Sequence, residues 1–518
     1  MKGGFMSIKP PVVWCVGGSD SSAHAGLQAD LRTGQDLRCH VQTIVTCITA
    51  QNSKEVRSVE PVSLAMFDEQ WQTLLDDVPP DAIKVSLLPS IEIAKACSIW
   101  LRRIKADFPN VLVVFDPVMA ASSESGNRLQ QDSVGASLLG SLLPYIDVIT
   151  PNSIEFKRLT GLSDQQPAVD IQGQLAVYLS SSKCAWLLKA GHSDSEQATD
   201  WLLDQDSIVG FAYKRLSVHN TRGTGCTLST ALASFIAHGY DLLDAMTMAK
   251  AYITGALKTG VQIGEGAGPL GRPGWPLQIE NLPAIVSPYK LSTVTQAPMH
   301  QSFAKMDLDK MGLYPVVDSI AWLKLVLKQG VKLAQLRIKD PDDADLASKI
   351  QQAIALGKEY EAQVFINDYW QEAIRFGAYG VHLGQEDLDV ADLAQIQAAG
   401  LRLGISTHGY YEIARAQSIQ PSYIALGHIF PTQTKDMPSQ PQGLKRLSYY
   451  ASLLKGVYPT VAIGGINAER LPAVAQTGVD SVALVTAITK VAEPEAATRS
   501  LICLFEKHSN TQRNTGGK

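Results

Sequence analysis

The sequence predicts an α/β protein of two domains: a parallel sheet covered by helices, then a small (β/α)₈ (TIM) barrel. Short apolar runs alternate with helix-like stretches through both halves of the chain. Polar motifs follow directly after many of these runs, as expected where ligands collect at the carboxyl ends of parallel strands. A length of 518 residues is also too great for one ordinary domain.

Composition and charge narrow the class of protein. Hydrophobic residues make up 45% and charged residues 18% of the chain, as in a globular enzyme. A net charge of -5 argues against a nucleic-acid partner. The seven cysteines never occur as Cys-x-x-Cys, which favours a reducing compartment. The apolar run Val12 to Val16 is too short for a signal peptide or a membrane span, so we expect a cytoplasmic protein without a membrane partner.

The first half opens with an apolar run, a glycine and serine turn and a helix-like stretch from Ala23 to Gln35, the start of an α/β unit. Polar residues follow the later runs in the motifs that begin at Asp116, Thr150 and Lys189. We expect strands at Val12 to Val16, Val41 to Cys47, Ile83 to Leu88, Val111 to Phe115, Val148 to Thr150 and Ala185 to Leu188, and a helix at Ile91 to Lys105.

The most specific stretch of this half is Asn220-Thr-Arg-Gly-Thr-Gly-Cys-Thr-Leu228. Gly223 and Gly225 remove side chains where a backbone can approach a ligand, and free N–H groups at a helix start bind anions. An ordinary helix entry capped by a threonine is the alternative. We expect the helix dipole to lower the pKa of the Cys226 thiol, although an inert packed cysteine would give the same sequence.

The motifs of the first half resemble those of hydroxymethylpyrimidine phosphate kinases, ribokinase-fold enzymes of thiamine biosynthesis. The resemblance spans roughly residues 10 to 275 and is carried by the run from Gly18 to Thr33, Gln51-Asn52, Asp116-Pro-Val-Met119, Thr150-Pro-Asn152 and Gly223-Thr-Gly-Cys226. It implies a ribokinase-like fold and ATP-dependent phosphorylation of hydroxymethylpyrimidine and then of its monophosphate, with ATP as co-substrate and Mg²⁺ as cofactor.

The resemblance also implies roles for individual residues. Asp30 and Gln51 would face the pyrimidine, and the Mg-ATP site would be formed by Asn152, Glu155, Lys189 and Thr221. Gly223, Gly225 and Cys226 would stabilise charge on the transferring phosphoryl group, with Cys226 as base or oxyanion-hole residue. The chain differs from the family at Ala23 and His24 (usually two glycines), Ser86 and Leu87 (glycine and methionine), Ala190 (glycine) and Arg222 (histidine).

A stretch with scattered prolines and little periodicity separates the halves. We place the kinase-like domain at residues 1–282, a linker at 283–305, the barrel at 306–507 and a polar tail at 508–518. Expected barrel strands are Leu313 to Val317, Lys332 to Lys339, Gln363 to Ile366, Gly380 to Leu383, Leu401 to Ile405, Tyr423 to Leu426, Thr460 to Ile463 and Ser481 to Val485; expected helices include Ala344 to Ala362, Trp370 to Phe376 and Ala391 to Ala399.

Unusual polar residues fall at the ends of these barrel strands, where barrel enzymes keep their active sites. In an extended strand Gln335, Arg337 and Lys339 would form a polar ladder on one face, suited to a diphosphate; a solvated edge strand is the alternative. Asp368 and Asp387 suit Mg²⁺ beside phosphate oxygens, although a lone aspartate more often caps a helix. The polar stretch 431–443 suits a closing lid.

These motifs resemble those of thiamine phosphate synthases over about residues 311 to 504, through Gln-Leu-Arg-Ile-Lys339, Asn367-Asp368, Gly-Gln-Glu-Asp387, Pro-Thr-Gln-Thr-Lys435 and Gly464-Gly-Ile466. The resemblance implies that the pyrimidine diphosphate is held by Gln335, Arg337, Lys339, Asn367 and Lys435, and Mg²⁺ by Asp368 and Asp387. It implies that the thiazole phosphate is received by Thr432, Thr434, Gly465, Val485 and Thr486. Ser406 would lie beside the reacting centre, with Lys435 the second catalytic candidate.

Together the resemblances predict a fused two-step enzyme of thiamine biosynthesis that acts on small-molecule substrates. Two alternatives concern the first half, which could sense a pyrimidine without phosphorylating it or could be a vitamin B6 kinase. A homo-oligomer is also compatible with the sequence.

Overall fold

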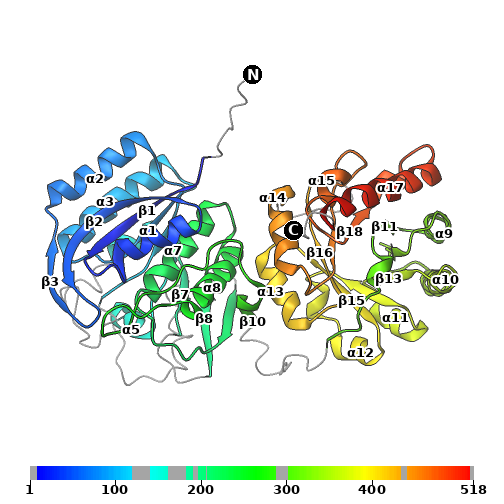
Figure 1. Cartoon of the computed structure of the whole chain (residues 1–518), viewed down its shortest axis with the longest axis horizontal. Helices are drawn as coiled ribbons and strands as arrows, with labels where there is room; N and C mark the ends of the chain where they lie inside the picture. The colour runs from blue at the N-terminus through cyan, green and yellow to red at the C-terminus, as the bar shows by residue number, and fades with distance from the viewer. Residues whose placement is uncertain are drawn as a thin grey trace. The chain divides into compact units, whose positions relative to one another are not determined.

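The chain folds as two compact units, Met1–Thr295 and Gln296–Lys518. The structure, a computed structural model, describes residues 9–119, 140–160, 183–190, 196–205, 207–286, 302–432 and 440–513. In both units strands and helices alternate along the chain (Figure 1). The predicted class, an α/β domain followed by a (β/α)₈ barrel, is confirmed by an open sheet in the first unit and a closed barrel in the second.

One mixed sheet organises the first unit, in the order β10-β9-β8-β7-β6-β5-β4-β1-β2-β3 among the described residues. From β7 to β2 in this order all neighbours pair in parallel; β3 at one edge and β8, β9 and β10 at the other pair antiparallel. The strands are β1 Val12–Asp20, β2 His40–Gln51, β3 Val56–Pro61, β4 Ala82–Val85, β5 Leu112–Phe115, β6 Val148–Ile149, β7 Ala185–Leu188, β8 Gln197–Leu203, β9 Ile208–Lys214 and β10 Ala284–Val286.

Helices pack on both faces of this sheet. Alternation along β1 puts Trp14 in a core cluster with Phe67 and Trp71 of α2, while Cys15 faces the other side, within electrostatic range of Asp30 on α1. The helices are α1 Gly26–Asp36, α2 Leu64–Asp77, α3 Ile91–Asp107, α5 Ser153–Thr160, α7 Thr224–Ala237 and α8 Leu242–Lys258, with 3₁₀ turns η1 Leu143–Tyr145 and η2 Ile279–Asn281. Helix α7 lies against β1, β4 and β5, and so meets the middle of the parallel sheet.

The second unit is a closed barrel of parallel strands in chain order, β11 to β18. The strands are β11 Leu313–Val317, β12 Leu333–Leu336, β13 Gln363–Asn367, β14 Gly380–Leu383, β15 Arg402–Thr407, β16 Tyr423–Leu426, β17 Thr460–Ala462 and β18 Ser481–Leu484. The helices are α9 Ile320–Lys328, α10 Leu346–Glu359, α11 Trp370–Phe376, α12 Leu393–Ala398, α13 Tyr410–Ile419, α14 Gly443–Leu454, α15 Leu471–Ala475, α16 Thr486–Thr489 and α17 Pro494–Arg513, with 3₁₀ turns η4 Leu308–Lys310 and η5 Asp387–Asp389.

Aromatic rings fill the barrel interior. Phe365 of β13 and Tyr423 of β16 meet edge to face with their ring centroids 5.1 Å apart, and Tyr314 of β11 lies 5.8 Å from Tyr423. Space for Tyr423 depends on Gly404 of β15, because a Cβ added at Gly404 would lie 2.2 Å from the Tyr423 ring. The barrel is therefore a packed core whose site must lie at a strand end.

Several predicted boundaries differ from the structure. Strand β12 ends at Leu336, three residues before Lys339, because its neighbour β11 ends at Val317 and the last bond between them runs from Arg337 N–H to the Val317 carbonyl. The antiparallel strands β3, β8, β9 and β10 were not predicted, since they lie outside the strand–helix alternation. Helix α17 continues to Arg513, into the predicted polar tail, because polarity alone does not end a helix.

The described ends of the predicted linker pack into the two units. Strand β10, Ala284–Val286, pairs with β9 in the first sheet. Phe303 is buried, and its N–H donates to the Gln420 carbonyl beside the barrel. Among the described residues, no helix is both long and apolar enough to cross a membrane.

Candidate functional site

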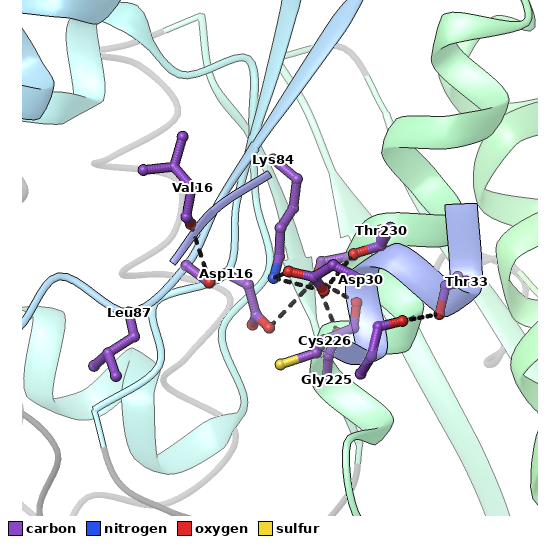
Figure 2. Close-up of polar contacts among 12 residues, drawn as sticks. Val16, Asp30, Thr33, Lys84, Leu87, Asp116, Gly225, Cys226 and Thr230 are labelled. Carbon is purple, nitrogen blue, oxygen red and sulfur yellow. Dashed lines mark hydrogen bonds and ion pairs between the residues drawn. The ribbon is translucent and has the colours of Figure 1, made fainter. Parts of the chain in front are cut away.

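A buried ion pair lies at the centre of the first unit, between α1 and the sheet. Lys84 of β4 donates to both carboxylate oxygens of Asp30 on α1, at 3.0 and 2.8 Å, and neither side chain is exposed. Thr230 of α7 donates to the same carboxylate at 2.7 Å. Burial lowers the pKa of Lys84, but the charges of Asp30 and of the other acidic groups nearby together outweigh burial, and the pKa is raised. Figure 2 shows these side chains converging from three elements.

A second ionic group begins directly after β5. Lys189 donates to Asp116 Oδ1 at 2.7 Å, and its ammonium lies 3.7 Å from Glu155 Oε2. Thr150 and Ser229 donate to Asp116 at 3.2 and 3.3 Å. Burial raises the pKa of Asp116, but the positive charges of Lys189 and Lys84 and the hydrogen bonds from Lys189 and Thr150 together have the larger effect, so its pKa is below the usual value. Burial raises the pKa of Glu155. The polar motifs after β5, β6 and β7 thus meet at one place.

The turn at the start of α7 meets this ionic group. Gly223 has φ of +83°, a left-handed conformation that favours glycine. At Gly225 an added Cβ would lie 3.2 Å from Asp116 Oδ2 and 3.4 Å from Lys189 Nζ, so the backbone of this turn lies close to the ion pair. Figure 2 shows Gly225 beside Asp116 and Cys226. A backbone N-terminus beside an ammonium group is an environment that accepts a phosphoryl group.

The predicted pKa of Cys226 is wrong in direction. Burial raises the pKa of this half-buried thiol to about 11, and the charges of Asp30 and Asp116 act the same way. The positive charge of Lys84 lowers the pKa but does not offset these effects. A neutral thiol can donate a hydrogen bond but is a poor base at neutral pH.

The predicted nucleotide residues have local contacts that the sequence pattern did not reveal. Asn152 Oδ1 accepts from the N–H of Glu155 at 2.9 Å, and Glu155 Oε2 accepts from the N–H of Asn152 at 2.8 Å. This reciprocal pair is a capping box at the start of α5. Thr221 is exposed, and its carbonyl accepts from the Thr224 hydroxyl at 2.5 Å. These residues therefore also shape the turns around Lys189.

Gln51 and two of the positions that differ from the family, Ala23 and Ser86, lie near β1 or the turn after it. The backbone N–H and carbonyl of Gln51 both bond the Ser21 hydroxyl, at 3.0 and 2.9 Å. Ala23 has φ of +58°, where glycine would be unstrained. Ser86 donates to the Val16 carbonyl at 3.2 Å and lies over Gly17, where an added Cβ would be 2.3 Å from Ser86 Oγ. The serine thus uses space that Gly17 provides.

In the barrel, hydrogen bonds form a continuous chain through the interior. Gln335 donates to the Tyr314 hydroxyl at 3.2 Å, and the two hydroxyls of Tyr314 and Tyr423 are 2.6 Å apart. His382 Nδ1 lies 2.7 Å from the Tyr423 hydroxyl, and its Nε2 lies 2.8 Å from Ser406 Oγ. The chain therefore fixes the hydroxyl of Ser406 from inside the barrel.

Gln335, Arg337 and Lys339 do not form the predicted ladder on one face of a strand, because only Gln335 lies within β12. Gln335 lies in the barrel interior with 3% exposure, Arg337 is half-buried beyond the strand, and Lys339 is exposed. The strand is too short to hold all three side chains on one face, since β12 ends at Leu336. The three residues still lie at or just beyond the carboxyl end of β12.

The carboxylates predicted to hold Mg²⁺ follow neighbouring strands. The N–H of Asp368 donates to the His382 carbonyl at 3.0 Å, which fixes the end of β13 beside β14. Buried Asn367 donates to Asp368 Oδ2, and the N–H of Gly384 donates to Asp387 Oδ2 at 2.9 Å. Asp368 is exposed and Asp387 half-buried, so both can face solvent and a ligand.

The predicted thiazole-phosphate residues lie after β16, β17 and β18. Gly465 has φ of +63°, and a Cβ there would lie 2.5 Å from the Pro431 carbonyl, so this turn packs closely on the segment before Thr432. Val485 directly precedes α16, whose first residue, Thr486, is exposed. Two predicted residues, Thr434 and Lys435, and most of the predicted lid lie outside the described residues.

A separate concavity of about 590 Å³ lies at the amino ends of the barrel strands. Tyr379, just before β14, and Arg402, at the start of β15, contribute to its wall. It is thus at the opposite end of the strands from Ser406 and Asp387, and it takes no part in the site described above.

Sequence reasoning missed several residues of these networks. Lys84 lies inside the predicted apolar strand Ile83 to Leu88, and a lone charge in a buried strand is a signal that indicates an ion pair. Asp116 lies in one of the predicted motifs, but the sequence pattern does not indicate that it is the hydrogen-bond partner of Lys189. His382, Tyr314 and Tyr423 lie within the predicted barrel strands, and nothing in their local sequence marks them as polar partners of each other.

Two α/β units, each with ionic or polar side chains gathered at the carboxyl ends of its strands, define a two-domain enzyme that acts on charged small molecules. A family model described as Phosphomethylpyrimidine kinase matches residues 20–271, and one described as Thiamine monophosphate synthase matches residues 313–488. The chain therefore joins a phosphomethylpyrimidine kinase domain to a domain that belongs to the thiamine-phosphate synthase family, and both domains are transferases.

Individual relatives match one half of the chain each. A thiamine-phosphate synthase from Pectobacterium atrosepticum is 60% identical over 197 residues, which are 38% of this chain and 92% of that protein. A solved phosphomethylpyrimidine kinase from Clostridium difficile 630 is 30% identical, with 47% of this chain and 99% of that chain covered and a TM-score of 0.39. A pyridoxal kinase from Staphylococcus aureus in complex with AMP-PCP is 26% identical, with 51% and 94% covered and a TM-score of 0.46.

Removing one partner of the central ion pair should destabilise the first unit. Lys84→Met leaves Asp30 as an unpaired buried charge, which costs about 3–5 kcal/mol. The double variant Asp30→Asn with Lys84→Met removes both charges and should recover most of that loss. Urea unfolding of the full chain measures both effects. A single variant as stable as the double variant would show that the pair does not hold α1 to β4.

Cys226 should react slowly with iodoacetamide at about pH 7.5, roughly 10-fold or more slower than the exposed Cys503, because its thiol is neutral and half-buried. Peptide mass spectrometry after timed quenching measures both rates. In urea, where both thiols are accessible, the difference should disappear. Equal rates in the folded protein would show that Cys226 is an activated thiolate.

Loss of His382 should weaken the synthase reaction through Ser406. His382→Ala breaks the bond to the Ser406 hydroxyl, and we expect about a 10-fold lower kcat/KM for the barrel, the equivalent of one hydrogen bond. Ser406→Ala and the double variant complete a cycle, in which the effects should not add. Kinase activity of the same protein is the internal control. Additive effects would show that His382 acts independently of Ser406.

Proposed function

We propose that both domains are active and work in sequence in thiamine biosynthesis. The first phosphorylates hydroxymethylpyrimidine and then its monophosphate with ATP, and the second joins the resulting diphosphate to a thiazole phosphate with release of pyrophosphate. The observation that carries this proposal is that one chain contains two domains of which the first makes what the second consumes.

In the kinase domain, the proposal is supported by the group of Asp116, Lys189 and Glu155 beside the turn at Gly225. Phosphoryl transfer requires positioning and neutralisation of negative charge more than a covalent catalyst. Lys189 and the start of α7 supply positive charge on one side, and Asp116 holds Lys189 in place. Because the Cys226 thiol is neutral, we assign it a hydrogen-bond donor role towards the transferred group and not that of a base.

In the synthase domain, the thiazole nitrogen forms a bond to the methylene carbon of the pyrimidine while the bond from that carbon to the diphosphate oxygen breaks. The electron pair of the broken bond leaves with pyrophosphate. Arg337 and Lys339 follow β12 and supply the positive charge that stabilises this leaving group. The hydroxyl of Ser406 lies 2.8 Å from His382 Nε2, and this contact supports the role that we propose for Ser406, which is to orient the pyrimidine.

The residues present fit Mg²⁺ only together with a phosphorylated ligand. Among the residues that the structure describes, no group of three His, Cys, Asp or Glu side chains could hold a metal ion. Mg²⁺ commonly binds through one or two carboxylates and substrate phosphate oxygens, so Asp368 and Asp387 suit an ion that arrives with the diphosphate. When bound, the ion would neutralise charge on the leaving pyrophosphate. A cytoplasmic location and a homo-oligomer stay predictions.

A one-pot assay tests the whole proposal. Purified protein with Mg-ATP, unphosphorylated hydroxymethylpyrimidine and thiazole phosphate should form thiamine phosphate, measured as thiochrome fluorescence after oxidation. Lys189→Met should abolish product unless ready-made pyrimidine diphosphate is added, because only the kinase domain loses its phosphate-binding cation. Arg337→Gln should lower product with either pyrimidine, because it weakens the synthase domain.

Mixing the two variants should restore product, since the diphosphate made by Arg337→Gln can be used by the barrel of Lys189→Met. Product from the wild type only when diphosphate is supplied would show that the first domain senses the pyrimidine without phosphorylating it. Phosphorylation of pyridoxal in place of hydroxymethylpyrimidine would instead identify the first domain as a vitamin B6 kinase.

A further inference from the structure

Two of the positions at which this chain differs from its kinase family lie together at the start of α7. Arg222 directly precedes Gly223, and a Cβ added at Gly223 would lie 2.3 Å from the His24 carbonyl. The positive charge of Arg222 also contributes to the lowered pKa of His24, after the larger effect of burial. The turn after β1 and the turn before α7 therefore bring an arginine and a histidine side by side.

Arg222 is buried without partners for part of its guanidinium. Its exposure is 3%, and Nε and Nη1 have no hydrogen-bond partner in the described part of the chain. His24 is 6% exposed, and its Nδ1 also has no partner there. A buried guanidinium without acceptors is costly, so a native structure that keeps one usually supplies the acceptor from a ligand or water.

The negative charge of Asp20 raises the pKa of Arg222, although burial has the larger, opposite effect. The Asp20 oxygens, however, accept hydrogen bonds from other groups. The Asp20 carboxylate accepts from the N–H groups of Ser22, His24 and Ala25 at 2.8, 3.1 and 2.8 Å, and from the Ser22 hydroxyl at 2.7 Å. No ion pair joins it to Arg222 among the described residues. Asp20 thus stabilises the turn after β1 and leaves the Arg222 donors to another acceptor.

The chemistry of the missing acceptor follows from the donors. A guanidinium has only N–H donors, in a planar fork that matches phosphate oxygens, and it stays charged at any working pH. The start of α7 adds N–H groups and the positive end of a helix dipole at the same place. Arg222 lies within electrostatic range of Cys226, in the first turn of that helix. All of these features favour an anion with several oxygens.

We propose that Arg222, with His24 beside it, binds a phosphoryl group at the start of α7. The proposal rests on the kinase function proposed above and adds a ligand to it. In this chain a permanent cation replaces the histidine that the family usually has at Arg222, while a histidine replaces a glycine at His24. The phosphoryl group belongs either to the pyrimidine monophosphate or to the terminal phosphate of ATP, and binding measurements separate the two.

The test compares wild type and Arg222→Gln by isothermal titration of the full chain, without turnover. The titrants are hydroxymethylpyrimidine monophosphate, unphosphorylated hydroxymethylpyrimidine and a non-hydrolysable ATP analogue. Loss of a charge-assisted hydrogen bond should weaken one phosphorylated ligand by about 10- to 100-fold and leave the unphosphorylated pyrimidine within about 2-fold. Weaker monophosphate binding assigns the site to the substrate phosphate, and weaker binding of the analogue assigns it to ATP.

Two further variants control for charge and geometry. Arg222→Lys keeps the charge but not the planar fork, and its affinity should lie between those of wild type and Arg222→Gln. Arg103→Gln removes one charge from an exposed arginine on α3 that contacts Gln72 and Asp107, and it should not change any of the three affinities. Unchanged binding of both phosphorylated ligands by Arg222→Gln would overturn the proposal.

A stability measurement separates binding from a structural role. Without ligand, Arg222→Gln should have the same Tm as wild type or a higher one, because an unpaired buried charge is removed. A lower Tm with unchanged affinities would make Arg222 a structural residue and overturn the proposal. If the wild type phosphorylates no pyrimidine, the kinase function fails, whereas the titrations, which need no turnover, still show whether Arg222 binds phosphate.

Discussion

Charge buried at the carboxyl ends of parallel strands is the constraint on which the first domain depends. The pairs Lys84–Asp30 and Lys189–Asp116 are tolerated in the interior because each charge has an opposite charge within hydrogen-bond distance. The same contacts hold α1 and α7 against the sheet, since Thr230 of α7 also donates to Asp30. The turn before α7, where we place phosphoryl transfer, is therefore positioned by interactions that also maintain the fold.

The barrel interior contains buried polar groups that are neutral, in contrast to the buried ion pairs of the first domain. These groups are hydroxyls, an amide and an imidazole, joined from Gln335 to Ser406 through Tyr314, Tyr423 and His382. Hydrogen-bonded neutral groups cost less free energy to bury than charges do. The barrel interior therefore contains neutral polar groups, while charged residues such as Lys339 and Asp368 lie exposed at the strand ends. The packed interior thus fixes the hydroxyl of Ser406 beside His382, while the charged residues follow β12, β13 and β14 at the strand ends.

Helices and strands whose bounds depend on the local apolar pattern were predicted correctly, whereas those that depend on a neighbouring strand were not. Three barrel strands and one helix have the bounds that the apolar pattern predicted: Leu313–Val317, Gly380–Leu383, Tyr423–Leu426 and Trp370–Phe376. The ladder after Gln335 failed because the length of a strand depends on where its neighbour ends. The antiparallel strands at the edges of the first sheet were not predicted, because they do not alternate with helices along the chain.

The sequence by itself determined the fold class, the two families and the strand ends at which polar residues gather, because motif order and hydrophobic periodicity are written along the chain. Only the tertiary structure decided which of those residues meet. Asp30 is 54 residues from Lys84 and 200 from Thr230, and the unpartnered donors of Arg222 arise from burial that no local pattern encodes. The protonation of Cys226 was decided in the same way, since burial and neighbouring charges outweigh the helix dipole that the sequence predicts.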